Sequence, residues 1–194
     1  LWVALSGYTV DLRIGKEILK GVADSYRRLR NTMRYILGNL AGFTEAERLP
    51  VAEMPELEQW VLHRLAELDT EVRKGYAAYD FQGVFQRLFT FCTVDLSSVY
   101  FDIRKDVLYC DAPESLRRRA ARTVMAEIFS FLTAWLAPIT CFTAEEAWLA
   151  RSHCSAVASS FSQRQRSSSS AACAYSVPAL VPNARRTSAS ALRS

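Results

Sequence analysis

Apolar residues recur at helical spacing through residues 1–150 of this 194-residue chain, and this pattern restricts the fold more than any other feature. In residues 17–40 they stand three or four positions apart and form one stripe: Ile18, Val22, Tyr26, Leu29, Met33, Ile36 and Leu40. That spacing predicts an amphipathic helix of about six turns. Gly42 is expected to end it.

Further segments show the same period: residues 55–76, 80–101, 114–135 and the shorter 143–149. Pro55 suits the first turn of a helix, Asp80 can cap the next one, and Pro138 must end another. Thr143 and Glu146 have the spacing of a capping box. No convincing set of strands accompanies these helices. We therefore predict an all-α fold, an antiparallel helix bundle over residues 15–150.

The composition changes abruptly at Arg151. Residues 151–194 contain no Asp, Glu, Lys or Gly and are rich in Ser, Ala and Arg. Such a segment buries too little apolar surface to offset the entropy of ordering it. We predict a disordered C-terminal tail over residues 151–194, and a shifted reading frame is one hypothesis for its composition.

The net charge of +4 does not by itself indicate a nucleic-acid partner. All 20 acidic residues lie in residues 1–150 together with 18 of the 24 Lys and Arg residues, whereas the tail carries six arginines. The helical region is therefore close to neutral, and nucleic-acid binding has to depend on local patches.

Several classes of site find no support in the sequence. The five cysteines are scattered and form no metal-binding pair, and the nucleotide-binding and hydrolase motifs are absent. We predict no catalytic residue and no metal ligand. No apolar run reaches the ~18 residues of a membrane span, which favours a soluble, cytoplasmic protein without a membrane partner.

The polar face of residues 17–40 is basic. Lys20, Arg27, Asn31 and Arg34 fall together opposite the apolar stripe, and Arg28 and Arg30 lie at the two edges of that face: the basic strip is Lys20, Arg27, Arg28, Arg30, Asn31 and Arg34. Arginine binds phosphate through a planar fork, and asparagine can pair with a base edge. The alternative is a charged face that serves solubility.

Three segments carry a family resemblance. Residues 24–40 read DSYRRLRNTMRYILGNL, residues 79–111 contain DLSS followed by YFDIRKD and LY, and residues 136–148 read LAPITCFTAEEAW. Together with residues 1–20, they resemble the anticodon-binding helical domain of isoleucyl-tRNA synthetases, which are class I aminoacyl-tRNA synthetases. The Phe91–Ser98 segment favours isoleucyl over valyl enzymes, and the valyl and leucyl relatives stay open as alternatives.

The resemblance implies that residues 1–14 are a remnant of the junction after a catalytic domain. It implies tRNA(Ile) rather than DNA as the partner, and a parent enzyme, expected to be monomeric, that attaches isoleucine to tRNA with ATP and Mg and edits errors. Zinc is expected in a C-terminal region of that parent. Because the catalytic motifs are absent, we expect this fragment alone to be inactive. A helical protein-interaction module without RNA binding is the alternative of another class.

Overall fold

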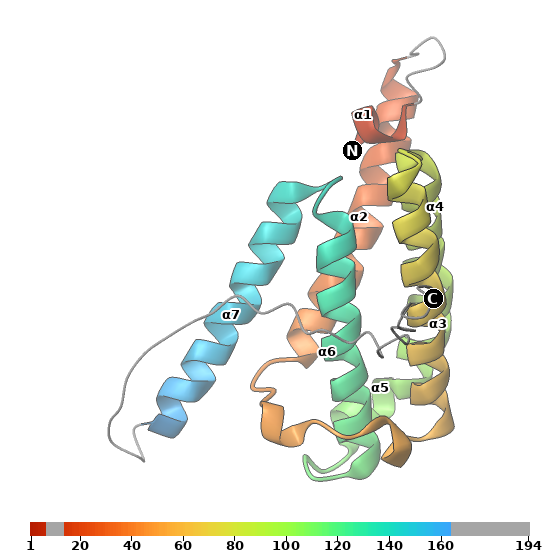
Figure 1. Cartoon of the computed structure of the whole chain (residues 1–194). Helices are drawn as coiled ribbons and strands as arrows, with labels where there is room; N and C mark the ends of the chain where they lie inside the picture. The colour runs from red at the N-terminus through yellow and green to blue at the C-terminus, as the bar shows by residue number, and fades with distance from the viewer. Residues whose placement is uncertain (7–13, 164–194) are drawn as a thin grey trace, which may run out of the picture.

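The computed structural model describes residues 1–6 and 14–163, with side chains as far as Ser152. The regular secondary structure of these residues is all helical, which confirms the predicted all-α fold. Figure 1 shows the long helices alternating in direction as an antiparallel bundle. The elements are α1 Trp2–Leu5, α2 Lys16–Asn39, two 3₁₀ turns Glu45–Glu47 and Val51–Glu53, α3 Glu56–Ala77, α4 Phe81–Thr90, a π-helix Phe91–Tyr100, α5 Phe101–Cys110, α6 Leu116–Leu136 and α7 Cys141–Gln163.

Helix α6 lies at the centre of the bundle and contacts α2, α3, α5 and α7. A helix covered on most sides has to be apolar on most sides. Its fully buried residues include Ala120, Val124, Met125, Ile128, Phe129 and Leu132. The other helices contribute the stripes that the sequence predicted, so the core forms between α6 and the helices around it.

Helix α2 ends as predicted, because the chain turns at Gly42, whose positive φ of 70° suits glycine. The second half of its stripe is buried, at Leu29, Met33, Ile36 and Leu40. The first half is not: Ile18 is 45% exposed. Figure 1 shows the reason, since the start of α2 projects beyond the end of α6.

Residues 81–110 form one continuous helical run through α4, the π-helix and α5, whereas we predicted a helix ending near Phe101. Asp80 caps the run as predicted, because its carboxylate accepts from the amide of Gly83 at 2.8 Å. Within the π-helix the wider turn moves the buried positions to intervals of five, at Phe91, Leu96 and Phe101. Val99, assigned to the stripe from an α-helical period, is exposed for this reason.

A buried ion pair joins α3 to α5. The guanidinium of Arg104 donates to both carboxylate oxygens of Glu58, at 2.6 and 2.8 Å, and the Glu58 side chain has no exposed surface. The hydroxyl of Tyr100 lies 3.5 Å from the same carboxylate. This pair fixes how α5 is rotated about its axis, which determines the side chains that α5 presents to α2.

The predicted capping box at the start of the last helix is wrong. Helix α7 begins at Cys141, so Thr143 and Glu146 lie inside it. Both side chains bond to α2 instead: Thr143 Oγ1 to the hydroxyl of Tyr26 at 2.8 Å, and Glu146 to Arg30. A spacing of three residues suits a capping box and also a pair of contacts on one helical face.

Helix α7 crosses the predicted start of the tail at Arg151. Helix α7 continues to Gln163, thirteen residues past Ala150, because extending a formed helix is much easier than starting one. Arg151 is anchored, since its guanidinium lies 5.1 Å from the centre of the Phe129 ring and donates to the carbonyl of Ala126 at 3.1 Å. Residues 164–194 lie outside the described residues, as do residues 7–13 of the predicted junction.

Candidate nucleic-acid interface

The basic strip lies on the surface of α2. All six of its residues are exposed: Lys20, Arg27, Arg28, Arg30, Asn31 and Arg34. Thr32 and Met33, between them in sequence, are buried, so helical periodicity separates the strip from the core. From Lys20 to Arg34 the strip extends about 21 Å along the helix at ~1.5 Å per residue.

Two arginines of the strip have carboxylate partners. Arg27 pairs with Asp24, one turn earlier on α2, at 2.7 Å. Arg30 makes a two-pronged contact with Glu146 of α7, at 2.7 Å for each prong, which raises the pKa of Arg30 and lowers that of Glu146. These pairs are exposed, and such pairs contribute little to stability and exchange readily with solvent.

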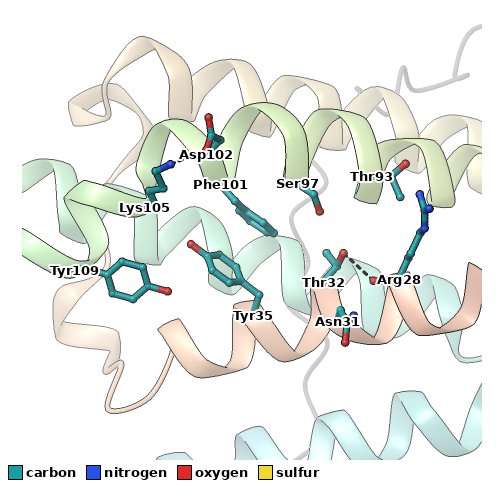
Figure 2. Close-up of a pocket in the computed structure, with 10 residues that line it drawn as sticks. All are labelled: Arg28, Asn31, Thr32, Tyr35, Thr93, Ser97, Phe101, Asp102, Lys105 and Tyr109. Carbon is teal, nitrogen blue, oxygen red and sulfur yellow. Dashed lines mark hydrogen bonds and ion pairs between the residues drawn. The ribbon is translucent and has the colours of Figure 1, made fainter. Parts of the chain in front are cut away.

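Arg28, at the opposite edge of α2 from Arg30, and Asn31 beside it face the π-helix and α5. There they line an open groove with a volume of about 580 Å³ (Figure 2). The lining residues are Arg28, Asn31, Thr32 and Tyr35 from α2, Thr93 and Ser97 from the π-helix, and Phe101, Asp102, Lys105 and Tyr109 from α5. In the part of the chain that the structure describes, the Arg28 and Asn31 side chains make no hydrogen bond or ion pair.

The two ends of the groove differ in chemistry. Figure 2 shows Tyr35, Phe101 and Tyr109 toward one end, and Arg28 and Asn31 toward the other. The rings of Tyr35 and Phe101 pack at a centroid distance of 4.6 Å, while Tyr109 is 67% exposed. A flat ring at the solvent edge of a groove that also carries cations is an arrangement suited to an unpaired base.

The hydroxyl of Tyr35 is buried at the aromatic end of the groove. Burial, with a further contribution from nearby Tyr109, raises the pKa of Tyr35 to about 12, so the hydroxyl keeps its proton at neutral pH. It stays a hydrogen-bond donor in that part of the groove.

The charges on the α5 side partly cancel. Lys105 donates to Asp102 at 2.9 Å, and both side chains are more than half exposed. The groove therefore offers a carboxylate as well as cations. Arg28 at the other end carries the unbalanced positive charge of the groove.

Sequence reasoning named two residues of the α2 wall, Arg28 and Asn31, and none of the opposite wall. Asp102, Lys105 and Tyr109 stood in the segment that carried the family resemblance, but their spacing alone indicated an ordinary helix end. The π-helix decides which of them face α2, and no local pattern predicts a π-helix. Lys105 and Tyr109 lie one helical turn apart, and this spacing was the sequence feature that could have indicated a basic and aromatic face on α5.

Within residues 1–6 and 14–163, no three His, Cys, Asp or Glu side chains are placed to hold a metal ion. Among the same residues, no helix is long and apolar enough to cross a bilayer.

Comparison with known proteins decides the family. A family described as "Anticodon-binding domain of tRNA ligase" matches residues 58–188. The chain belongs to this family. The match crosses the composition change at Arg151 and includes the π-helix and α5, which form one wall of the groove. The fold of this anticodon-binding domain is the all-α bundle described above.

Similar curated proteins are isoleucine–tRNA ligases. The chain is 68% identical to that of Ruegeria pomeroyi over 152 residues, and 54% identical to that of Caulobacter vibrioides over 152 residues. It is also 54% identical to that of Agrobacterium fabrum over 151 residues. Each alignment covers 78% of this chain and 16% of the relative. The matched part of this chain therefore spans about a sixth of the length of these relatives.

Proposed function

We propose that this chain is the part of an isoleucine–tRNA ligase that binds the anticodon stem and loop of tRNA(Ile). The observation that carries the proposal is the 68% identity to an isoleucine–tRNA ligase within a family of anticodon-binding domains. The whole ligase would act in the cytoplasm and attach isoleucine to tRNA with ATP and Mg. We assign that chemistry, and any zinc, to parts of the ligase other than this chain.

The basic strip supplies the contacts to phosphate in this proposal. Lys20, Arg27 and Arg34 are exposed along one face of α2 and can follow a sugar-phosphate backbone over about 21 Å. Arg28 continues the strip into the groove. Arg30 can exchange Glu146 for a phosphate, because an exposed ion pair is weak in water.

The test is a double charge reversal, Arg27→Glu with Arg34→Glu, with affinity for an anticodon stem-loop RNA of tRNA(Ile) measured against salt. Each lost phosphate contact should reduce the slope of log affinity against log salt by about 0.7 to 0.9. Binding should weaken strongly at low salt, while the melting temperature stays close to that of the wild type because both sites are exposed.

Arg73→Glu is the matched control. Arg73 is 71% exposed and pairs with Asp69 on the same helix, as Arg27 is 70% exposed and pairs with Asp24. It lies on α3, outside the strip. Equal losses of affinity in Arg27→Glu and Arg73→Glu would show that net charge, rather than the strip, governs binding, and unchanged binding in the double reversal would leave the strip as a solvated face.

A further inference from the structure

Arg30 joins the basic strip to another helix. Among the described residues, the strip has two carboxylate partners: Asp24, which lies on α2 itself, and Glu146, which lies on α7. Asp24 can leave Arg27 without moving any other element. Glu146 belongs to the surface by which α7 packs on α2, so its contact with Arg30 ties the strip to the position of α7.

The contact with Glu146 uses a part of Arg30 that a phosphate would also use. The two terminal nitrogens of the guanidinium, Nη1 and Nη2, each donate to one oxygen of Glu146 at 2.7 Å. Arginine binds carboxylate and phosphate in this same two-pronged geometry. While Glu146 holds both nitrogens, this edge of the guanidinium is closed to RNA.

Arg30 also stands between two arginines that the proposed function assigns to the RNA backbone. Arg27 lies three residues before it and Arg34 four residues after it. Residues at these spacings are neighbours on a helix, with Cβ atoms about 5–6 Å apart. A backbone that runs from Arg27 to Arg34 therefore passes the carboxylate of Glu146, and the like charges repel each other.

A second polar contact between α7 and α2 lies beside this pair. Thr143 Oγ1 is 2.8 Å from the hydroxyl of Tyr26, and the guanidinium of Arg30 donates to the same hydroxyl at 3.4 Å. A movement of Arg30 away from Glu146 therefore disturbs both polar contacts.

The apolar contacts of α7 in this region are modest. Between residues 141 and 152 its buried apolar side chains are Ala144 and Ala147, and an alanine buries little apolar surface. The larger apolar side chains of the same stretch, Phe142, Trp148 and Leu149, are exposed. The polar contacts with α2 therefore contribute much of what keeps α7 docked there.

We propose that RNA on the basic strip and the docking of α7 on α2 oppose each other, because a phosphate and Glu146 compete for the fork of Arg30. The proposal rests on the proposed function and goes beyond it, since it makes α7 a regulatory element of the strip. In the free chain Glu146 lowers the affinity of the strip for RNA. Bound RNA in turn weakens the hold of α2 on α7, and the two effects are equal by thermodynamic linkage.

The first experiment measures the affinity of the full chain for an anticodon stem-loop RNA of tRNA(Ile) at low salt. Glu146→Gln keeps the size of the side chain and removes the competing charge. It should bind RNA about 2- to 5-fold more tightly, the range for one exposed ion pair, and the gain should shrink as salt is added.

Glu145→Gln is the matched control. Glu145 is the preceding residue of α7, it is exposed, and within the described part of the chain its carboxylate makes no hydrogen bond or ion pair. The variant removes the same charge from the same helix and should bind RNA as the wild type does. Equal gains of affinity in Glu145→Gln and Glu146→Gln overturn the proposal.

Arg30→Gln separates competition from simple repulsion. Without the guanidinium there is no fork to compete for, so Glu146→Gln should bring less gain in affinity in this background than in the wild type. A carboxylate that only repelled phosphate would give a gain as large or larger, because Arg30 would no longer neutralise it. That result overturns the competition.

Hydrogen exchange measures the effect on α7 in the same complex. The stem-loop RNA should protect amides of α2 and speed exchange in residues 143–151 by about 2- to 5-fold, the same factor by linkage. In Glu146→Gln this exchange should already be raised without RNA and should change little when RNA is added.

Exchange of α7 in the wild type that stays unchanged or slows when RNA binds overturns the coupling. A failure of the proposed function gives a different result, since the wild-type chain itself would not bind the stem-loop, and the coupling would fail with it.

Discussion

At the scale of single residues, the buried pair of Glu58 and Arg104 joins α3 to α5, the helix that forms part of one wall of the groove. Glu58→Ala would leave the Arg104 guanidinium buried without its carboxylate, and breaking such a pair costs about 3–5 kcal/mol. We expect that loss in the free energy of unfolding measured with urea. Asp24→Ala removes the exposed partner of Arg27 and should change stability by less than about 1 kcal/mol. Similar small losses in both variants would show that the buried pair is not tightly formed.

A second residue-scale prediction concerns alkaline pH. Burial raises the pKa of Tyr76 to about 12 from its ordinary 10.0, and its hydroxyl donates to the carbonyl of Trp135. The folded protein therefore holds this proton more tightly than the unfolded chain does. The resulting stability is fully present below pH 10.0 and is lost as pH rises toward 12.

Tyr76→Phe has no such proton to lose. Urea unfolding from about pH 9 to about pH 11.5 should show a shallower loss of stability in Tyr76→Phe than in the wild type. Tyr79→Phe, exposed at the turn between α3 and α4, is the control and should follow the wild type. Parallel pH profiles for Tyr76→Phe and the wild type would contradict the account.

At the scale of elements, helix α7 gives a test of where the ordered chain ends. The peptide bond after Arg151 lies inside α7, and the Arg151 side chain is held against Phe129 and Ala126. Proteases need a locally unfolded segment, so brief trypsin treatment should leave this bond intact. Mass spectrometry of the early fragments checks this. Rapid cleavage after Arg151 would instead support the boundary that composition suggested.

The elements also show how far sequence reasoning reaches. Apolar spacing predicted α2, α3 and α6, and the start of α4, to within a few residues, because each helix buries one stripe against the bundle. It failed where the period changes, at the π-helix, and where a helix continues without an apolar stripe, beyond Ala150. Both failures have the same cause, since periodicity reports burial and not backbone hydrogen bonding.

The candidate site also has one part that helical spacing predicts and another part that it does not. The basic strip lies on one element, so helical geometry places all six of its residues on the surface. The groove is made by elements about 60 residues apart in sequence, and its second wall depends on the rotation that the π-helix and the Glu58–Arg104 pair impose on α5. Such a juxtaposition cannot be obtained from a single stripe.

At the scale of the whole molecule, the proposed role follows from local charge and not from net charge. Residues 1–150 are close to neutral, so non-specific attraction to nucleic acid is weak and binding depends on where cations gather. The strip on α2 and the groove beside it lie next to each other. An RNA partner of the proposed kind would therefore meet the strip and the groove on a single side of the bundle.

The most direct test of this account compares two RNAs taken from the same tRNA(Ile): the anticodon stem-loop and a hairpin of the acceptor stem. Both carry phosphates, so non-specific attraction acts on both and is reduced by salt in the same way. The full chain should bind the anticodon stem-loop more tightly at every salt concentration, and the difference should persist when salt weakens both complexes. Equal affinity for the two RNAs, or a preference for the acceptor hairpin, would contradict an anticodon-binding role.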